Sequence, residues 1–236
     1  METTLLAVDD FVGISFFITS MALLAATVFF AFERQDVLPK WRLSLTVMIN
    51  VTLVAFVHYL YMRDLWITSS SSPVTYRYID WFITVPLQII EFYLILSANQ
   101  IVSLYLFWRL LIASIAMLVF GYIGETGLGD VMIFFGLGMA GWLIILYEIF
   151  LGEASKISQN LQSASTKLAF SALRLIVTVG WAIYPVGYVY GYTMNEPDMA
   201  TLNIIYNIAD FINKIAFGMV IWYCARMDSS VQKPAT

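Results

Sequence analysis

Seven apolar segments, each about 20 residues long, run through the chain, at about 11–32, 43–62, 78–97, 104–123, 131–151, 168–192 and 202–225. A helix of this length spans the hydrocarbon core of a bilayer. Only 12% of the 236 residues are charged, compared with roughly 25% in soluble domains. No connection is long enough to hold a further domain. The sequence therefore predicts an all-α membrane protein in which residues 1–236 form one domain with seven transmembrane helices.

Basic residues are unequally divided between the two ends of these helices. One end receives Arg34, Lys40, Arg42, Arg109, Lys156, Lys167, Arg174, Arg226 and Lys233. The other end receives only Arg63 and Arg77. By the positive-inside rule the first end is cytoplasmic. We therefore expect a multi-pass protein of the cell (inner) membrane, with the N-terminus outside and the C-terminus cytoplasmic.

Charge and composition also argue against several functions. The net charge is only −4, and the acidic residues gather at the outer end, so we expect no nucleic-acid partner. Cys224 is the only cysteine and has no partner for an intrachain disulfide. No metal site is expected. The start METTLLAVDD lacks a basic region and a small-residue cleavage site, so we expect no cleavable signal peptide.

Lys214 lies inside the seventh apolar segment, one helical turn after Asp210. A charge at the centre of a membrane helix costs about 2.5–3.5 kcal/mol even on lenient insertion scales, so it needs a reason. A buried amine can form a Schiff base with an aldehyde or ketone. A structural Lys–Asp pair that joins helices is the alternative, and the cost of the charge fits both interpretations.

The third segment, RYIDWFITVPLQIIEFYLIL, carries a polar ladder of Asp80, Thr84, Gln88 and Glu91. The spacings of four, four and three residues place these side chains on one helix face. Asp80 and Glu91 are about 16 Å apart along the axis, roughly half the hydrocarbon thickness. Two carboxyl groups at different depths suit a proton relay, in which one accepts a proton and the other supplies one. The alternative is that both only make hydrogen bonds between helices.

Tyr206, Asp210 and Lys214 recur at intervals of four in the seventh segment, with Asn213 beside them. Lys214 thus has one anionic candidate in its own helix and another, Asp80, in a neighbouring helix. Both carboxylates would stabilise a protonated Schiff base at the lysine. Arg77 is expected to balance the surplus negative charge toward the outer side.

Aromatic residues follow the sixth segment, where GWAIYPVGYVYGY places Trp181, Tyr184 and Tyr188 at helical spacing. Pro185 predicts a kink there, and Trp81 adds a ring from the third segment. Such stripes are more often packing or interface belts than cofactor sites. Their depth near the buried lysine favours flat apolar walls for a conjugated ligand.

His58, the only histidine, lies in the second segment. A lone histidine in an apolar helix is usually a hydrogen-bonded structural residue. Its titration range would also let it influence a nearby carboxyl group such as Asp80.

These features resemble the microbial (type 1) rhodopsins and, within them, the proteorhodopsin group of light-driven proton pumps. The resemblance covers nearly the whole chain and is strongest in RYIDWFITVPLQIIEFYLIL, FGYIGE, GWAIYPVGY and NIIYNIADFINKIAFG. It implies all-trans retinal bound covalently to Lys214 as a Schiff base. The implied retinal pocket contains Trp81, Trp181, Tyr184, Pro185, Tyr206 and Asn213.

The resemblance also implies a role for each polar residue of the third segment. Asp80 would be principal counterion and proton acceptor, Glu91 cytoplasmic proton donor, and Thr84 the middle of an acceptor–threonine–donor triplet. Asp210 would be the second counterion. His58 matches the family histidine that hydrogen-bonds the acceptor carboxylate. Release of the proton would pass the region of Arg77, assisted by Glu125.

Gln88 occupies the position that separates blue-absorbing from green-absorbing relatives, where the green form has leucine. We therefore expect a blue-absorbing pigment. The alternative is that Gln88 only bonds a neighbouring backbone group.

The resemblance also implies a homo-oligomer, a pentamer or hexamer. Some relatives carry a tryptophan in the first segment that reaches the histidine of the adjacent subunit. Phe17 stands at that position here, which departs from the pattern.

Two other functions remain open from the sequence. A blue-light photosensory rhodopsin would signal through a partner protein, although such a sensor does not need the donor Glu91. A transporter insensitive to light, with a structural Lys214, is the third.

Overall fold

The computed structural model describes residues 6–193 and 198–232, and these ranges are almost entirely helical. Lys233, which was assigned to the cytoplasmic end, lies outside the described residues. The elements in chain order are α1 (Phe11–Glu33), η1 (Arg34–Asp36), α2 (Pro39–Ser69), α3 (Val74–Ser97), α4 (Leu104–Glu125), α5 (Val131–Phe150), α6 (Glu153–Gln159), α7 (Ala164–Leu175), the π-helix η2 (Ile176–Gly180), α8 (Ile183–Tyr192) and α9 (Met199–Gln232).

Seven helical stretches in the described ranges are long and apolar enough to cross a membrane. They are Phe11–Asp36, Pro39–Ser69, Val74–Ser97, Leu104–Glu125, Val131–Gln159, Ala164–Tyr192 and Met199–Ser230. The predicted seven-helix, all-α membrane fold is confirmed. Several helices extend beyond their apolar segments, because backbone hydrogen bonds continue into the polar ends.

Short polar side chains begin several of the helices. Asp10, Ser103, Asp130 and Ser163 each accept a hydrogen bond from a backbone N–H in the first turn of the helix that follows. These caps satisfy N–H groups that have no partner within the helix. They therefore fix where the membrane helices start.

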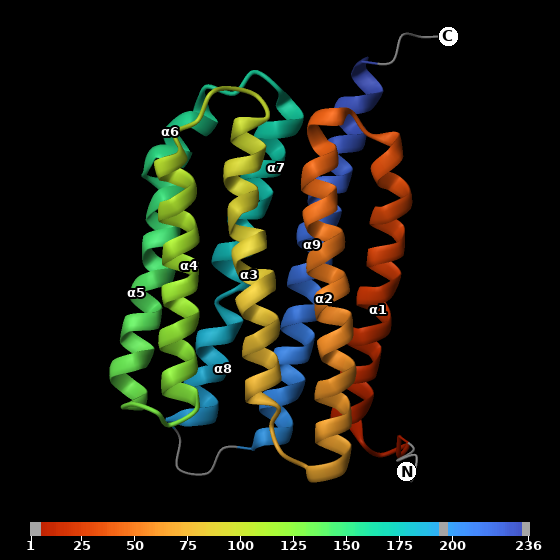
Figure 1. Cartoon of the computed structure of the whole chain (residues 1–236), viewed down its shortest axis with the longest axis vertical. Coiled ribbons are helices and arrows are strands. Elements are labelled where there is room, and N and C mark those ends of the chain that lie inside the picture. Colours follow the sequence, from red (N-terminus) through yellow and green to blue (C-terminus); the bar gives the residue numbers. More distant parts are fainter. Residues whose placement is uncertain (1–5, 194–197, 233–236) are drawn as a thin grey trace.

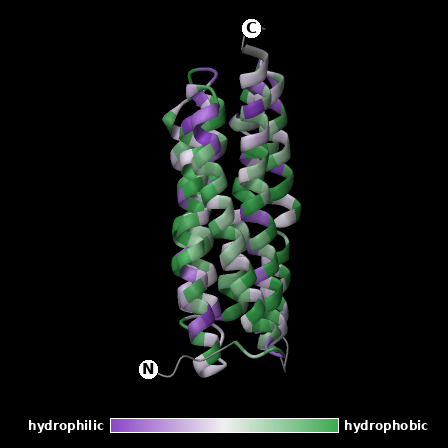
Figure 2. Ribbon diagram, turned by 90° about the vertical axis from the view of Figure 1, so that its right-hand side faces the viewer, coloured by the Kyte–Doolittle hydropathy of each residue, from purple (hydrophilic) through white to green (hydrophobic). Residues whose placement is uncertain are grey.

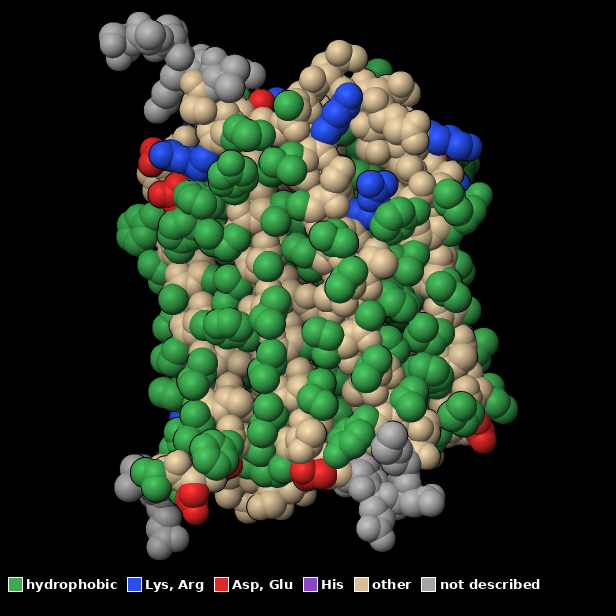
Figure 3. All heavy atoms as spheres, turned by 180° about the vertical axis from the view of Figure 1, so that it is seen from behind, with side chains coloured by type: hydrophobic (Ala, Val, Ile, Leu, Met, Phe, Trp, Pro, Cys, Tyr) green, Lys and Arg blue, Asp and Glu red, His purple; other side chains and the backbone are tan. Residues whose placement is uncertain are grey.

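The helices form one upright bundle, with the beginning of α1 and the end of α9 at opposite ends (Figure 1). Ribbons coloured by hydropathy are mainly green along their length (Figure 2). On the face shown in Figure 3, exposed apolar side chains cover the middle, and charged side chains gather toward the two ends. Such a continuous apolar band is the surface that a lipid bilayer covers. The protein is thus a multi-pass membrane protein.

α3 and α9 are the most enclosed of the spans, with 56% and 50% of their apolar windows buried. These are the two helices that carry the predicted lysine and carboxylates. The fold therefore places those polar groups inside the bundle, away from lipid.

The sixth span is the irregular one, and its break does not coincide with the expected kink at Pro185. The backbone forms a π-turn over Ile176–Gly180, in which Trp181 N–H donates to Ile176 C=O at 3.1 Å. α8 begins only at Ile183. Pro185 has no N–H for the Trp181 carbonyl, which accepts instead from Tyr184 N–H at 3.1 Å. The proline therefore changes the hydrogen bonding of the turn that precedes it.

Candidate functional site

Lys214 lies between two carboxylates in the interior of the bundle. Its Nζ donates to Asp80 Oδ2 at 2.5 Å and to Asp210 Oδ2 at 2.9 Å. The lysine is 2% exposed and neither aspartate is exposed. α9 supplies Lys214 and Asp210 one turn apart, and α3 supplies Asp80. The structure thus brings together the three residues that the sequence analysis grouped.

The two carboxylates differ in their other hydrogen bonds. Asp210 also accepts from Tyr59 Oη at 2.8 Å, from Tyr184 Oη at 2.6 Å and from Trp81 Nε1 at 3.3 Å. Asp80 Oδ1 is buried and has no hydrogen-bond partner among the described residues. Asp210 is therefore held as an anion by neighbouring donors. Asp80, in contrast, has an oxygen that can accept a proton without the loss of an existing hydrogen bond.

Thr84 and Glu91 continue along α3 from Asp80. The Thr84 hydroxyl donates to the backbone carbonyl of Asp80 at 3.0 Å, so it contacts the helix rather than the carboxylate. Glu91 is fully buried, and neither of its carboxyl oxygens has a hydrogen-bond partner among the described side chains and backbone. An ionised carboxylate without partners is costly in such a place. This environment suits a side chain that keeps its proton until it is needed.

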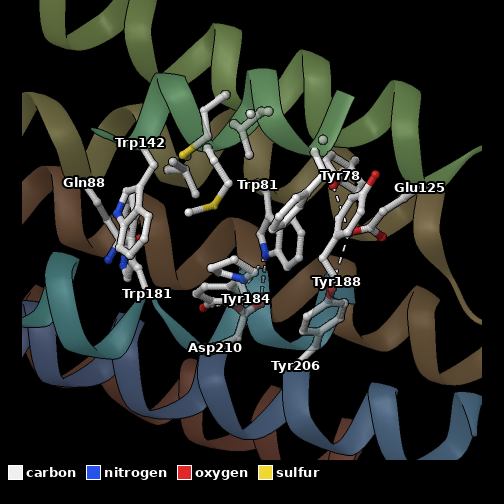
Figure 4. A pocket seen from close by; sticks show the side chains of 18 of the residues that line it. Tyr78, Trp81, Gln88, Glu125, Trp142, Trp181, Tyr184, Tyr188, Tyr206 and Asp210 are labelled. Carbon is white, nitrogen blue, oxygen red and sulfur yellow. Dashed lines mark hydrogen bonds between the residues drawn. The ribbon is translucent and has the colours of Figure 1, made fainter. Parts of the chain in front are cut away.

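An apolar cavity lies inside the bundle (Figure 4), and Lys214 is one of the residues that line it. Counting its mouth, it encloses about 780 Å³, in the size range of sites that hold small organic ligands. It is lined by Tyr78, Trp81, Val85, Gln88, Met117, Leu118, Gly121, Glu125, Phe135, Gly138, Met139, Trp142, Trp181, Tyr184, Pro185, Tyr188, Tyr206, Asp210 and Lys214. Of the predicted pocket residues, only Asn213 is outside this lining.

The cavity fits retinal in two respects. Retinal is a long conjugated aldehyde, so it requires an amine for attachment and flat apolar walls. Lys214 supplies the amine, and the indole rings of Trp81 and Trp181 lie on the cavity wall, both largely buried. The two carboxylates beside Nζ match the positive charge that a protonated linkage would carry.

Asn213 supports the irregular sixth span instead of lining the cavity. Its Nδ2 donates to the Gly180 carbonyl at 2.9 Å, and Trp142 Nε1 donates to the Val177 carbonyl at 3.1 Å. Both carbonyls belong to the π-turn, where the regular helical pattern of hydrogen bonds is interrupted. A Cβ at Gly180 would lie 2.0 Å from Asn213 Oδ1, so the close approach requires glycine. Side chains from α5 and α9 thus stabilise the break beside the cavity.

Gln88 reaches the cavity wall from α3, in the group formed with Trp142 and Trp181 (Figure 4). Its Nε2 is buried and makes no hydrogen bond with the described residues. The amide therefore remains a free dipole facing the cavity.

Arg77 is buried on the same face of α3 as Asp80, one turn from it, but contacts neutral groups. Its guanidinium donates to Asn203 Oδ1 at 2.9 Å and to Asn207 Oδ1 at 3.2 Å. It also lies over the Tyr206 ring, 5.2 Å from the centroid. No ion pair joins it to a carboxylate among the described residues, and its balancing of the negative charge of the aspartates stays a prediction.

Glu125 lies at the opposite end of the cavity from Gln88 and accepts hydrogen bonds from two tyrosines (Figure 4). Tyr78 Oη donates to its Oε1 at 3.0 Å and Tyr206 Oη at 3.4 Å. Tyr206 also lies beneath the Arg77 guanidinium. Arg77 and Glu125, the two residues expected in proton release, therefore both contact Tyr206.

The expected hydrogen bond between His58 and Asp80 is absent from the described structure. His58 Nδ1 lies 2.9 Å from the Val54 carbonyl, one turn earlier in α2. Lys214 Nζ instead donates to Asp80 Oδ2, and Asp80 Oδ1 has no hydrogen-bond partner among the described residues. Tyr59, the next residue in α2, is the one that reaches a site carboxylate.

Sequence reasoning missed several residues of this site. Asn203 and Asn207 precede Asp210 and Lys214 at spacings of four, three and four, so the same helix face could have revealed them. Tyr59, Tyr78 and Trp142 gave no such signal, because single aromatic residues in apolar helices are common.

Comparisons with known proteins agree with this architecture. Residues 10–227 match the family model described as "Bacteriorhodopsin-like protein". The chain is 49% identical to a blue-light absorbing proteorhodopsin from Gamma-proteobacterium Hot 75m4, over 95% of this chain and 90% of that protein. It is also 49% identical to a green-light absorbing proteorhodopsin from Gamma-proteobacterium EBAC31A08, over 94% and 89%.

A solved structure gives the same result. The blue light-absorbing proteorhodopsin from Med12 is 53% identical and superposes with a TM-score of 0.82, covering 92% of this chain and 99% of that one. With a family model matched over most of its length, this chain belongs to the bacteriorhodopsin-like protein family.

Proposed function

We propose that the protein is a light-driven outward proton pump with all-trans retinal bound covalently to Lys214. When bound, retinal would supply the absorption of visible light and the light-dependent release of the proton held at Nζ. Trp81, Trp181, Tyr184 and Pro185 would hold the chromophore, and the carboxylates of Asp80 and Asp210 would balance the charge at Nζ.

The observation that carries the proposal is the asymmetry between the two carboxylates. Asp80 lies 2.5 Å from Nζ and has a free oxygen, whereas Asp210 has three further donors. A proton that leaves Nζ therefore moves to Asp80 at the lowest cost in broken hydrogen bonds. Asp210 remains an anion and keeps the site oriented.

Glu91 would return a proton toward Nζ from the other end of α3. Its burial without a polar partner fits a carboxyl group that holds a proton at rest. Release from Asp80 would pass the opposite way, through the group of Arg77, Tyr206 and Glu125. One helix thus separates uptake from release, which gives transport a direction.

The direction relative to the cell follows from the basic residues. Lys40, Arg109 and Arg226 lie near the end at which α9 finishes, and by the positive-inside rule this end is cytoplasmic. Glu91 is nearer that end than Asp80, so protons would move outward. The N-terminus would then be outside.

Colour and assembly are two further parts of the proposal. The similarity to a blue-absorbing and to a green-absorbing relative is equal at 49%, so blue absorption rests on the free amide of Gln88. A pentamer or hexamer is proposed from the family resemblance. Phe17 stands where some relatives carry a tryptophan, and the Arg63 guanidinium lies over its ring, 5.4 Å from the centroid.

A photosensor that signals through a partner protein is the second candidate, because it would use the same pigment. Illumination of liposomes or cells that contain the protein and retinal separates the two. A pump acidifies the outside medium, and a protonophore abolishes the change. A coloured protein without a light-dependent change in pH would favour the sensor.

A further inference from the structure

The proposed function requires Glu91 to regain a proton from the cytoplasm after each turnover, yet the side chain is fully buried without a polar partner. A route must therefore connect it to the end of the bundle at which α9 finishes. The following inference rests on the proposed function and concerns this route.

A second pocket lies between the ends of α2 and α3 on that side. Counting its mouth it encloses about 540 Å³, and it is lined by Pro39, Lys40, Leu43, Ser44, Leu94, Ser97 and Ala98. Leu94 and Ser97 follow Glu91 by three and six residues, about 4.5 and 9 Å along the helix. The pocket therefore lies above Glu91 on α3.

Ser44 is one of the residues that line this pocket and is 3% exposed. Its hydroxyl lies near the Glu91 carboxyl group without making a hydrogen bond of regular geometry to it. A hydroxyl both donates and accepts, so it can pass a proton between water and a carboxylate. Ser44 is thus a polar residue that both lines the pocket and lies near Glu91.

Lys40 lies on the pocket wall one turn before Ser44, and Asp228 of α9 holds its amine. Lys40 Nζ is 2.6 Å from Asp228 Oδ2, and Asp228 also accepts from Trp41 Nε1 at 2.9 Å. A free cation beside a proton entrance repels incoming protons and stabilises an ionised donor. The ion pair neutralises this charge and draws the amine toward α9.

We propose that this pocket is the entrance for protons to Glu91, with Ser44 as the last relay and Lys40 kept from obstructing it by Asp228. Lys40 and Asp228 are positioning residues, because they act on uptake through the charge beside the pocket. Asp228 has no contact with Asp80, Asp210 or Lys214 among its hydrogen bonds and ion pairs in the described structure.

Chemical labelling tests the entrance without light. Ser44→Cys, made in a Cys224→Ser background, should react with a small charged thiol reagent added from the C-terminal side. Thr52→Cys, two turns deeper in α2 and fully buried, is the matched control and should react much more slowly. Equal labelling of both positions, or none at Ser44→Cys in a protein that still forms pigment, would overturn the entrance.

Flash kinetics test the positioning role of the ion pair. Asp228→Asn keeps the shape and the acceptor for Trp41 but leaves Lys40 unpaired. We expect reprotonation of Glu91 to slow about tenfold, the effect of one charge roughly 10 Å away at an effective dielectric constant of about 20. The double variant Lys40→Gln with Asp228→Asn should restore the original rate, which a merely structural role of Asp228 would not do.

An unchanged rate in Asp228→Asn, or a double variant as slow as Asp228→Asn alone, would overturn the role of the pair. Wild-type protein that forms pigment but moves no protons would instead reject the proposed pump. The two failures are therefore distinguishable.

Discussion

Asp80 and Asp210 both accept a hydrogen bond from Lys214, but only Asp210 is bound by other side chains. Tyr59, Tyr184 and Trp81 donate to Asp210 from three different helical elements. The position of Asp210 is thus determined by the packing of the bundle. The Asp80 carboxylate accepts a side-chain hydrogen bond only from the lysine among the described residues. A change in the charge or orientation of Nζ therefore affects Asp80 before Asp210.

The first prediction concerns the acceptor. Asp80→Asn should abolish light-driven proton release, with a loss of at least about 100-fold, because the one remaining carboxylate beside Nζ, Asp210, is already bound by three other donors. The pigment should also absorb at longer wavelength, since the anion stabilises the ground state in which positive charge is at Nζ. Absorption spectra and external pH recording check both effects. Persistent pumping by Asp80→Asn would refute its role as acceptor.

The second prediction concerns the donor. Glu91→Gln should form normal pigment but slow the return of a proton about 100-fold or more, because the amide has no proton to donate. Flash absorption kinetics measure this step. Glu148→Gln is a matched control, since Glu148 is also a largely buried glutamate but pairs with Arg109. Equal slowing in both variants would mean that Glu91 has no specific role.

The third prediction concerns colour. Gln88→Leu should shift the absorption maximum to longer wavelength, because a free dipole that favours the ground-state charge distribution is removed. Gln100→Leu, at an exposed position outside the cavity, should leave the spectrum unchanged. An unshifted spectrum in Gln88→Leu would leave blue absorption without support.

The fourth prediction concerns the π-turn. Asn213→Leu should destabilise the protein by about 1–3 kcal/mol, because the partly buried Gly180 carbonyl loses its side-chain donor. Gly180→Ala should also destabilise, since its Cβ would lie 2.0 Å from Asn213 Oδ1. Thermal bleaching of the pigment reports both. Gly136→Ala, where nothing lies within 4 Å of the added carbon, is the control and should be neutral or stabilising.

The fold was predictable because membrane helices depend on length and hydrophobicity, which the sequence displays directly. The positions of Asp80, Asp210 and Lys214 on helix faces were also predictable from spacing. Their meeting at one point follows from these faces all being polar in an apolar bundle.

Other features depend on contacts between distant residues. Nothing near Gly180 announces a π-turn, because its carbonyls are satisfied by Asn213 and Trp142 from other helices. The hydrogen-bond partners of Arg77 are Asn203 and Asn207 of α9, and no local feature of α3 indicates this pairing. His58 and Tyr59 show the same limit, since a rotation of one residue along α2 decides which of them reaches the site.

Time-resolved infrared spectroscopy tests most directly where the Nζ proton goes. After a flash, a C=O band of a protonated carboxyl group should appear in wild-type protein and in Asp228→Asn, and it should be missing in Asp80→Asn. A band that persists unchanged in Asp80→Asn would contradict the assignment of Asp80 as the proton acceptor.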